Sequence, residues 1–154
     1  MVLWLKITSL AAVLALTVSF TAACGGQKAE VLQDGCYTAQ AAEFSYGWKE
    51  YVTILVKGGK IVSVEYNAKN PSGFIKSWDN AYMQQMFHIQ GTYPNDYTRF
   101  YAAQLLESQG APDHPYDLKT GATSSYNSFS LLADAVIQLA RQGEDTMVLV
   151  NTDG

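Results

Sequence analysis

The chain contains 154 residues, of which 10 are Lys or Arg and 14 are Asp or Glu, and its formal net charge is -4. This length is enough for one folded domain and leaves no room for two. The acidic balance lacks the basic surface that neutralises phosphates, so nucleic acid is excluded as an expected partner. Only 16% of the residues are charged and 12% are aromatic, which favours an exported ligand-binding domain over a disordered chain.

The N-terminus has the pattern of a secretory signal. Lys6 is followed by an uncharged run, Ile7–Phe20, and then by small residues up to Cys24. The apolar run is too short to span a bilayer comfortably, and its length is typical of a signal-peptide core. Residues 1–23 are therefore predicted to be a signal peptide, with a short uncleaved membrane anchor as the alternative.

The end of this signal resembles the lipobox of bacterial lipoproteins. Ala22 and Ala23 precede Cys24, whose thiol would be lipidated as it becomes the new N-terminus, although Thr21 stands where Leu is usual. Ordinary secretion without lipid is the alternative. Residues 24–33 are expected to be a flexible tether and residues 34–150 the folded domain, held by lipid on the extracytoplasmic face of the cell membrane.

Once Cys24 carries lipid, Cys36 is the remaining thiol of the exported chain. The chain then has no disulfide, so a packed core must supply its stability. Cys36 lies in a predicted strand with nothing basic beside it, so we interpret it as a small buried hydrophobic residue and not as a catalytic thiol.

Three β-strands are predicted in the first half of the domain. The first is Cys36–Phe44, and the runs Tyr51–Val56 and Lys60–Tyr66 are rich in β-branched residues. Gly58 and Gly59 between these runs supply the positive φ angles of a tight hairpin turn. Alternation predicts that one side of the hairpin covers a core, through Val52, Ile54, Val56, Val62, Val64 and Tyr66.

The second half of the domain has the period of helices. Asp79–Gln90 is expected to be helical, ended by Gly91, with a broad apolar face of Tyr82, Met83, Met86, Phe87 and Ile89. A second helix starts at Pro94–Asp96 and is stopped by Gly110 and Pro112, with the apolar residues Tyr97, Phe100, Tyr101, Leu105 and Leu106.

A third helix is predicted from about Ser125 to Arg141, with the apolar stripe Phe129, Leu132, Val136, Ile137 and Ala140. A closing strand is predicted at Thr146–Val150. Strands followed by helices and one more strand predict an α+β fold, in which an antiparallel sheet with a β-hairpin packs against about three helices.

The sequence contains no familiar metal or acid-base motif. His88 and His114 are far apart, and there is no CxxC, HExxH or GxSxG pattern. Each His is therefore expected to be structural or on the surface, and no catalytic residue is assigned.

Hydroxyl side chains are concentrated just before the third predicted helix. Five of the nine residues from Thr120 to Ser128 are Ser or Thr, whereas a helix cap needs one hydroxyl. The free amides and the positive end of the helix dipole also favour a phosphate here. Gly121 and Ala122 would keep its approach open. From the residues alone, a phosphate site and a plain helix cap both remain open.

The run Asp117-x-x-Thr120-Gly121-Ala122-Thr123 resembles the flavinylation motif of the FMN-binding domain family. This family includes one of the subunits of the sodium-pumping NADH:quinone reductase. Asp34-Gly35-x-Tyr37, Gly47-Trp48-Lys49-x-Tyr51-Val52 and the Gly-Gly hairpin are similar to its extracytoplasmic lipoprotein branch, in which a treponemal major membrane immunogen is placed.

The resemblance implies that an FAD:protein FMN transferase joins FMN through its phosphate to Thr123. The amides around Ser124, Ser125 and Tyr126 would then hold the phosphate. The domain would carry electrons between redox partner proteins that the sequence does not identify, and it would not turn over a substrate of its own. Trp48, Tyr116 and Tyr126 are candidates to contact the flavin ring. The alternatives are a lipoprotein that binds flavin or another phosphate ligand non-covalently, and a surface lipoprotein without a cofactor.

We predict that Cys24→Ala releases the domain from the membrane or leaves the signal peptide uncleaved, because this thiol is the expected site of lipid attachment. Membrane fractionation and N-terminal mass analysis measure this, with Cys36→Ala as the matched control. Full membrane retention of a normally processed Cys24→Ala protein would contradict the lipid anchor.

Overall fold

A computed structural model describes residues 31–152. In chain order its elements are β1 (Gly35–Ala41), β2 (Lys49–Lys57), β3 (Lys60–Lys69), the 3-10 helix η1 (Lys76–Trp78), α1 (Asn80–Gln90), α2 (Pro94–Ser108), α3 (Thr123–Gln142) and β4 (Val148–Val150). The four strands form one sheet in the order β3-β2-β1-β4, with β4 parallel to β1 and the other pairs antiparallel. The predicted α+β fold is confirmed, and the closing strand makes the sheet mixed.

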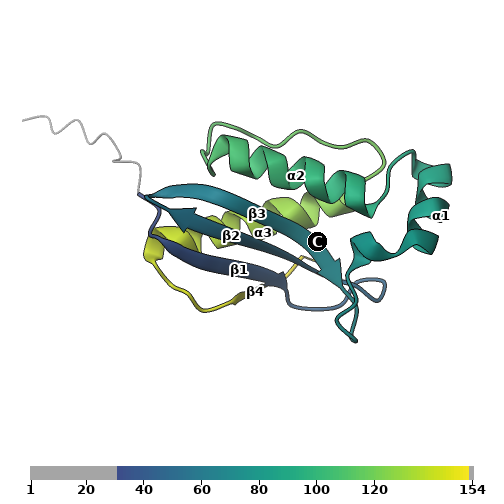
Figure 1. Ribbon diagram of the computed structural model, residues 1–154, viewed down its shortest axis with the longest axis horizontal. Helices are drawn as coiled ribbons and strands as arrows, with labels where there is room; N and C mark the ends of the chain where they lie inside the picture. The colour runs from purple at the N-terminus through teal and green to yellow at the C-terminus, as the bar shows by residue number, and fades with distance from the viewer. Residues whose placement is uncertain (1–30, 153–154) are drawn as a thin grey trace, which may run out of the picture.

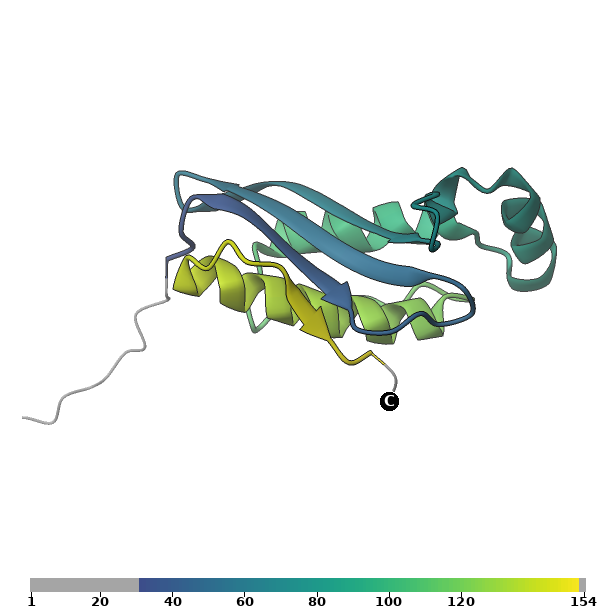
Figure 2. The same ribbon diagram turned by 90° about the horizontal axis from the view of Figure 1, so that it is seen from below.

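Helices α2 and α3 cover one face of the sheet, and α1 stands beyond its end (Figures 1 and 2). Among the described residues, no helix lies over the other face of the sheet, and alternate residues of the strands are exposed there. In β1, Tyr37 and Ala39 face the helices and are 2% and 0% exposed, whereas Cys36 faces solvent. The prediction that Cys36 is buried is therefore wrong, because this strand covers a core on one side only.

The predicted hairpin joins β2 to β3, and both turn glycines have positive φ, 60° at Gly58 and 71° at Gly59. A register shift follows the turn, because Val56 pairs with Ile61 while Leu55 pairs with Ser63. This β-bulge leaves Val62 without an opposite residue and turns its side chain outward. Ile61 is buried in its place, which corrects the prediction that Val62 lies in the core.

Helix α1 begins and ends as predicted but buries none of its residues. Asp79 caps it by accepting from the Tyr82 amide, and Gly91 ends it in the left-handed conformation. Its predicted apolar face is only partly used, since Phe87 is 53% and Ile89 69% exposed. That part of the prediction is wrong because the helix lies past the end of the sheet (Figure 2). Phe87 contacts the Tyr93 ring there, at 6.0 Å between ring centroids, but more than half of its surface stays exposed.

The core lies between the sheet and the pair of helices α2 and α3. The predicted stripe of α3 is buried throughout, as are Tyr97, Tyr101 and Leu105 of α2. Aromatic rings fill its centre, where Phe129 stacks on Tyr101 at 5.2 Å and lies 5.0 Å from Tyr66 between ring centroids. α3 thus packs its apolar stripe against the sheet, as predicted from its periodicity.

The described chain begins close to the C-terminal end of α3. Leu32 is buried, and the Gln33 amide donates a hydrogen bond of 2.7 Å to the Ala140 carbonyl. The predicted signal peptide and Cys24 lie outside the described residues. Between residues 31 and 152, no helix has both the length and the apolar character needed to cross a bilayer.

We predict that Leu132→Ala lowers the free energy of unfolding by about 2–5 kcal/mol, because it removes a fully buried side chain and leaves a cavity. The neighbouring Leu131 is 45% exposed, so Leu131→Ala is the matched control and should cost less than about 1 kcal/mol. Denaturant unfolding measures both variants, and equal losses would contradict the orientation of α3.

Candidate functional site

A cleft of about 1300 Å³ opens at the N-terminal end of α3. It is lined by the first turns of α3, the β1–β2 loop, η1 and α1, with Tyr46, Trp48, Tyr82, Met86 and Tyr126 among its side chains. Clefts that bind small molecules usually measure about 300–1000 Å³ and combine apolar walls with a few polar groups. This cleft is large enough for a dinucleotide-sized or smaller ligand and has walls of this kind.

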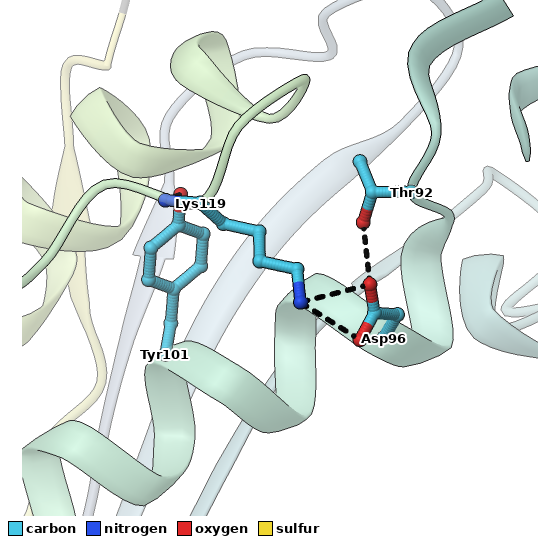
Figure 3. A network of polar contacts seen from close by, with 4 residues as sticks. All are labelled: Thr92, Asp96, Tyr101 and Lys119. Carbon is cyan, nitrogen blue, oxygen red and sulfur yellow. Dashed lines mark hydrogen bonds and ion pairs between the residues drawn. The ribbon is translucent and has the colours of Figure 1, made fainter.

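A polar network ties the loop before α3 to α2 (Figure 3). Lys119 forms an ion pair with Asp96 at 3.1 Å, and Thr92 donates a hydrogen bond of 2.7 Å to the same carboxylate. The Tyr101 hydroxyl accepts from the Lys119 amide and donates to the Ala122 carbonyl, at 3.1 and 3.2 Å. Since Tyr101 belongs to the buried core, these bonds fix the start of α3 relative to the core.

Gly121 brings this loop against the end of α1. Its φ is +82°, and a Cβ at this position would collide with the Gln90 carbonyl oxygen. Ala122 is 3% exposed. From the sequence, the small size of Gly121 and Ala122 is attributed to an open path for phosphate. The structure gives a different reason, because both positions are packed against protein and a larger side chain would not fit.

Helix α3 begins two residues earlier than predicted, so that Thr123 and Ser124 belong to its first turn. Its N-cap residue is Ala122, and no side chain accepts from the first amides. The interpretation of the hydroxyl cluster as a plain cap is therefore wrong. Within residues 31–152, the amides of Thr123, Ser124 and Ser125 have no hydrogen-bond acceptor, which leaves the positive end of a 20-residue helix open to the cleft.

The structure brings most of the sequence-predicted site residues together. Gly121, Ala122, Thr123, Ser124, Ser125 and Tyr126 all line the cleft. Thr123 and Ser124 are exposed, Ser125 is buried beneath them, and Tyr126 is half-buried. The Thr123 hydroxyl is thus accessible from the solvent side of the cleft.

Two residues of the predicted motif lie elsewhere. Asp117 and Thr120 are exposed on the loop and are not part of the cleft lining. The Asp117 backbone is bound by the Gln104 side chain of α2. Of the three ring candidates, Trp48 and Tyr126 line the cleft, whereas Tyr116 packs on Phe129 at 4.9 Å and lines a smaller cavity of about 410 Å³.

The cleft also contains charged residues that the sequence reasoning missed. Glu50 of β2 accepts a hydrogen bond of 2.9 Å from Tyr66, whose hydroxyl also lies 3.0 Å from the Ser125 carbonyl oxygen. Burial raises the pKa of Glu50, while the Ser128 hydroxyl and the positive charge of Lys76 lower it. Burial lowers the pKa of Lys76, which the negative charge of Glu50 partly offsets.

A signal for Glu50 was present in the sequence. Val52, Ile54 and Val56 define the core side of β2, and Glu50 is the next residue on that side. A carboxylate at a core-facing position needs a polar partner or a functional role. No comparable signal marks Lys76, which lies in the single turn of η1.

The described residues contain no group of three or more His, Cys, Asp and Glu side chains that could hold a metal ion. His88 and His114 are both exposed, as predicted for surface residues.

Comparison with known proteins gives one curated relative and a shared fold. No family model matches the sequence. The 15 kDa lipoprotein of Treponema pallidum is 36% identical over 119 residues, which are 77% of this chain and 83% of that protein. The crystal structure of the CPE2226 protein from Clostridium perfringens is 34% identical, has a TM-score of 0.72, and is matched over 78% of this chain and 98% of that chain.

A solution structure from Clostridium thermocellum is 28% identical over 75% of this chain and 95% of that chain, with a TM-score of 0.42. None of these three names mentions a flavin. The resemblance to the FMN-binding domain family therefore stays a prediction.

We predict that Gly121→Ala destabilises the protein more than Gly73→Ala does. Gly73 has almost the same φ, +85°, but a Cβ there meets nothing within 4 Å. The control therefore carries only the cost of positive φ, about 1 kcal/mol, whereas the collision at Gly121 adds about 1–3 kcal/mol. Thermal unfolding compares the two, and equal losses would show that Gly121 is not packed against α1.

Proposed function

Because the chain belongs to the family of the 15 kDa lipoprotein of Treponema pallidum, we propose that it is an exported, membrane-anchored flavoprotein that carries FMN on Thr123 and serves as an electron carrier. The observation that carries this proposal is the uncapped start of α3, which faces a large cleft with aromatic walls. The chain's own residues bind and orient the cofactor, and no residue needs to turn over a substrate.

The residues at the start of α3 fit a phosphate. The amides of Thr123, Ser124 and Ser125 lack acceptors among the described residues, and a phosphate diester presents oxygens that can accept from them. The positive end of the helix dipole stabilises the negative charge. The bonds from Tyr101 hold this turn in place before any ligand arrives, which reduces the entropy lost on binding.

Thr123 is suited to accept FMN from FAD. Its hydroxyl is exposed on the cleft, so a transferase can reach it. In the transfer, the Thr123 hydroxyl would give its proton to the transferase or to water, and its oxygen would form a bond to the FMN phosphorus. The bond from that phosphorus to the AMP oxygen would break, and AMP would leave. The product is a phosphodiester that keeps one negative charge beside the open amides.

The rest of the cleft fits a flat ring system. Trp48, Tyr82 and Tyr126 supply aromatic surfaces and Met86 an adaptable apolar one. When bound, the isoalloxazine ring of FMN would supply the electron-transfer chemistry. The side chains of the cleft would hold the ring, limit its contact with water and tune its reduction potential.

The family relationship supports the lipid anchor, because the relative is named a lipoprotein. We propose that Cys24 carries the lipid. The described chain begins beside Ala140, near the C-terminal end of α3, whereas the cleft is at the N-terminal end of that helix. About 25 Å of helix separate the two, at about 1.5 Å per residue, so the cleft lies at the opposite end of the domain from the tether and is accessible to redox partners.

We predict that protein made together with the transferase gains the mass of one FMN residue and stays fluorescent after denaturing electrophoresis. Thr123→Ala should lose both signals, because it removes the acceptor oxygen, and Thr123→Ser should keep a fraction of them. Ser124→Ala is the matched control, since Ser124 is an equally exposed neighbour in the same turn, and it should still be modified.

A wild-type protein that gains no mass would contradict covalent attachment and leave reversible phosphate binding to the same turn. Flavin that remains attached in Thr123→Ala would move the acceptor to another residue. Protein that contains no flavin in any preparation would favour a surface lipoprotein without a cofactor.

A further inference from the structure

Two opposite charges on the wall of the cleft have no role in the phosphate site proposed above. Glu50 from β2 and Lys76 from η1 both line the cleft and act on each other electrostatically. Within residues 31–152 they do not form a direct ion pair. Lys76 instead lies over two rings, with its Nζ 5.9 Å from the Trp48 ring centroid and 5.4 Å from that of Tyr82.

The carboxylate of Glu50 is held in place by a residue of the core. The Tyr66 hydroxyl, itself in the core, donates a hydrogen bond of 2.9 Å to its Oε1, and the nearby hydroxyls of Ser128 and Ser125 lower the pKa of the carboxyl. A carboxylate has about four acceptor sites, so the bond from Tyr66 leaves capacity for a further donor. Protein surrounds Glu50 on most sides, but part of its surface remains open to the cleft.

This arrangement differs from that of a purely structural ion pair. Removing a carboxylate and an ammonium group from water is costly, and a stabilising pair normally offsets that cost by direct contact. Here the two charged groups remain apart in one cleft, beside aromatic walls. Glu50 can accept a hydrogen bond and Lys76 can donate one. Together they suit a ligand that has a hydrogen-bond donor and an acceptor on adjacent atoms.

We propose that Glu50 and Lys76 recognise the imide edge of a flat heterocycle, with Glu50 accepting from the ring N–H and Lys76 donating to the adjacent carbonyl oxygen. The proposal rests on the proposed function, because the pyrimidine edge of a flavin has an N–H between two carbonyl groups. Trp48 and Tyr82, the two rings beside Lys76, would then contact the bound ring. Glu50 and Lys76 are positioning residues that select the ring, whereas α3 selects the phosphate.

Because Glu50 and Lys76 are both ionisable and partly buried, binding of the ring should depend on pH. Burial raises the pKa of Glu50 above the ordinary carboxyl value, so its acceptor is lost as the pH falls through this raised value. Burial lowers the pKa of Lys76, so its charge is lost earlier than usual as the pH rises. The other groups that face this pair are Tyr66 from β3, Tyr82 from α1, Tyr97 from α2, and Ser125 and Ser128 from α3.

The test uses lumiflavin, which has the ring without the phosphate, and the full chain made without the transferase. Fluorescence titration should show that wild type binds lumiflavin about tenfold more tightly than Glu50→Gln does, because a charge-assisted hydrogen bond is replaced by a neutral one. Glu43→Gln is the matched control, since Glu43 is exposed and outside the cleft lining, and it should bind as wild type does.

A change in the ligand tests the same contact without any variant. In 3-methyllumiflavin a methyl group replaces the imide hydrogen, so wild type should bind it about tenfold more weakly than lumiflavin. Glu50→Gln should discriminate less between the two ligands, and wild type should bind lumiflavin more weakly at acidic pH. Absence of lumiflavin binding to wild type, or equal binding of both ligands, would overturn the proposal.

This experiment separates the inference from covalent attachment. If lumiflavin binds as expected while the chain gains no FMN mass, the ring site stands and attachment to Thr123 is wrong. If FMN is attached but lumiflavin binding is insensitive to the imide and to Glu50, attachment stands and the role of Glu50 and Lys76 is wrong.

Discussion

The hydroxyl of Tyr101 connects the core to the site. The Tyr101 ring stacks on Phe129 inside the core, while its hydroxyl binds the Lys119 amide and the Ala122 carbonyl. These two bonds place the loop and the first turn of α3 without using a side-chain cap. The start of the helix can therefore remain open to a ligand, since the stability that a cap would give is supplied by contacts with the core.

The sequence predicted the fold well where periodicity and local turn chemistry decide the structure. The pair Gly58-Gly59 and the alternation in β2 specify the hairpin, and the stripe from Phe129 to Ala140 specifies the face of α3. The sequence-based prediction was wrong where the position of another element decides which side chains are buried. Periodicity shows which face of α1 is apolar but not how much of that face other elements cover, so it does not predict that Phe87 is 53% exposed. It also cannot place the bulge that moves Val62 outward.

The site was predictable from the sequence only where its residues are neighbours along the chain. The motif from Gly121 to Tyr126 is continuous in sequence and folds into a single turn, so its members meet in the cleft. Asp117 and Thr120 belong to the motif but lie outside the lining, because the loop turns away from the cleft before Gly121. Glu50 could have been predicted from the alternation in β2, which places it on the core side of that strand. Lys76 lies in η1 and reaches the cleft only through the tertiary structure, so the sequence carries no local signal for it.

We propose that Thr123 carries FMN when the protein is produced in its own host. Peptide mapping by mass spectrometry tests it most directly, because cleavage after Lys119 and Arg141 releases Thr120–Arg141, which contains the whole first turn of α3. This peptide should carry one FMN residue, with fragment ions that place it on Thr123. An unmodified peptide from membrane-bound protein, or flavin on a different residue, would contradict it.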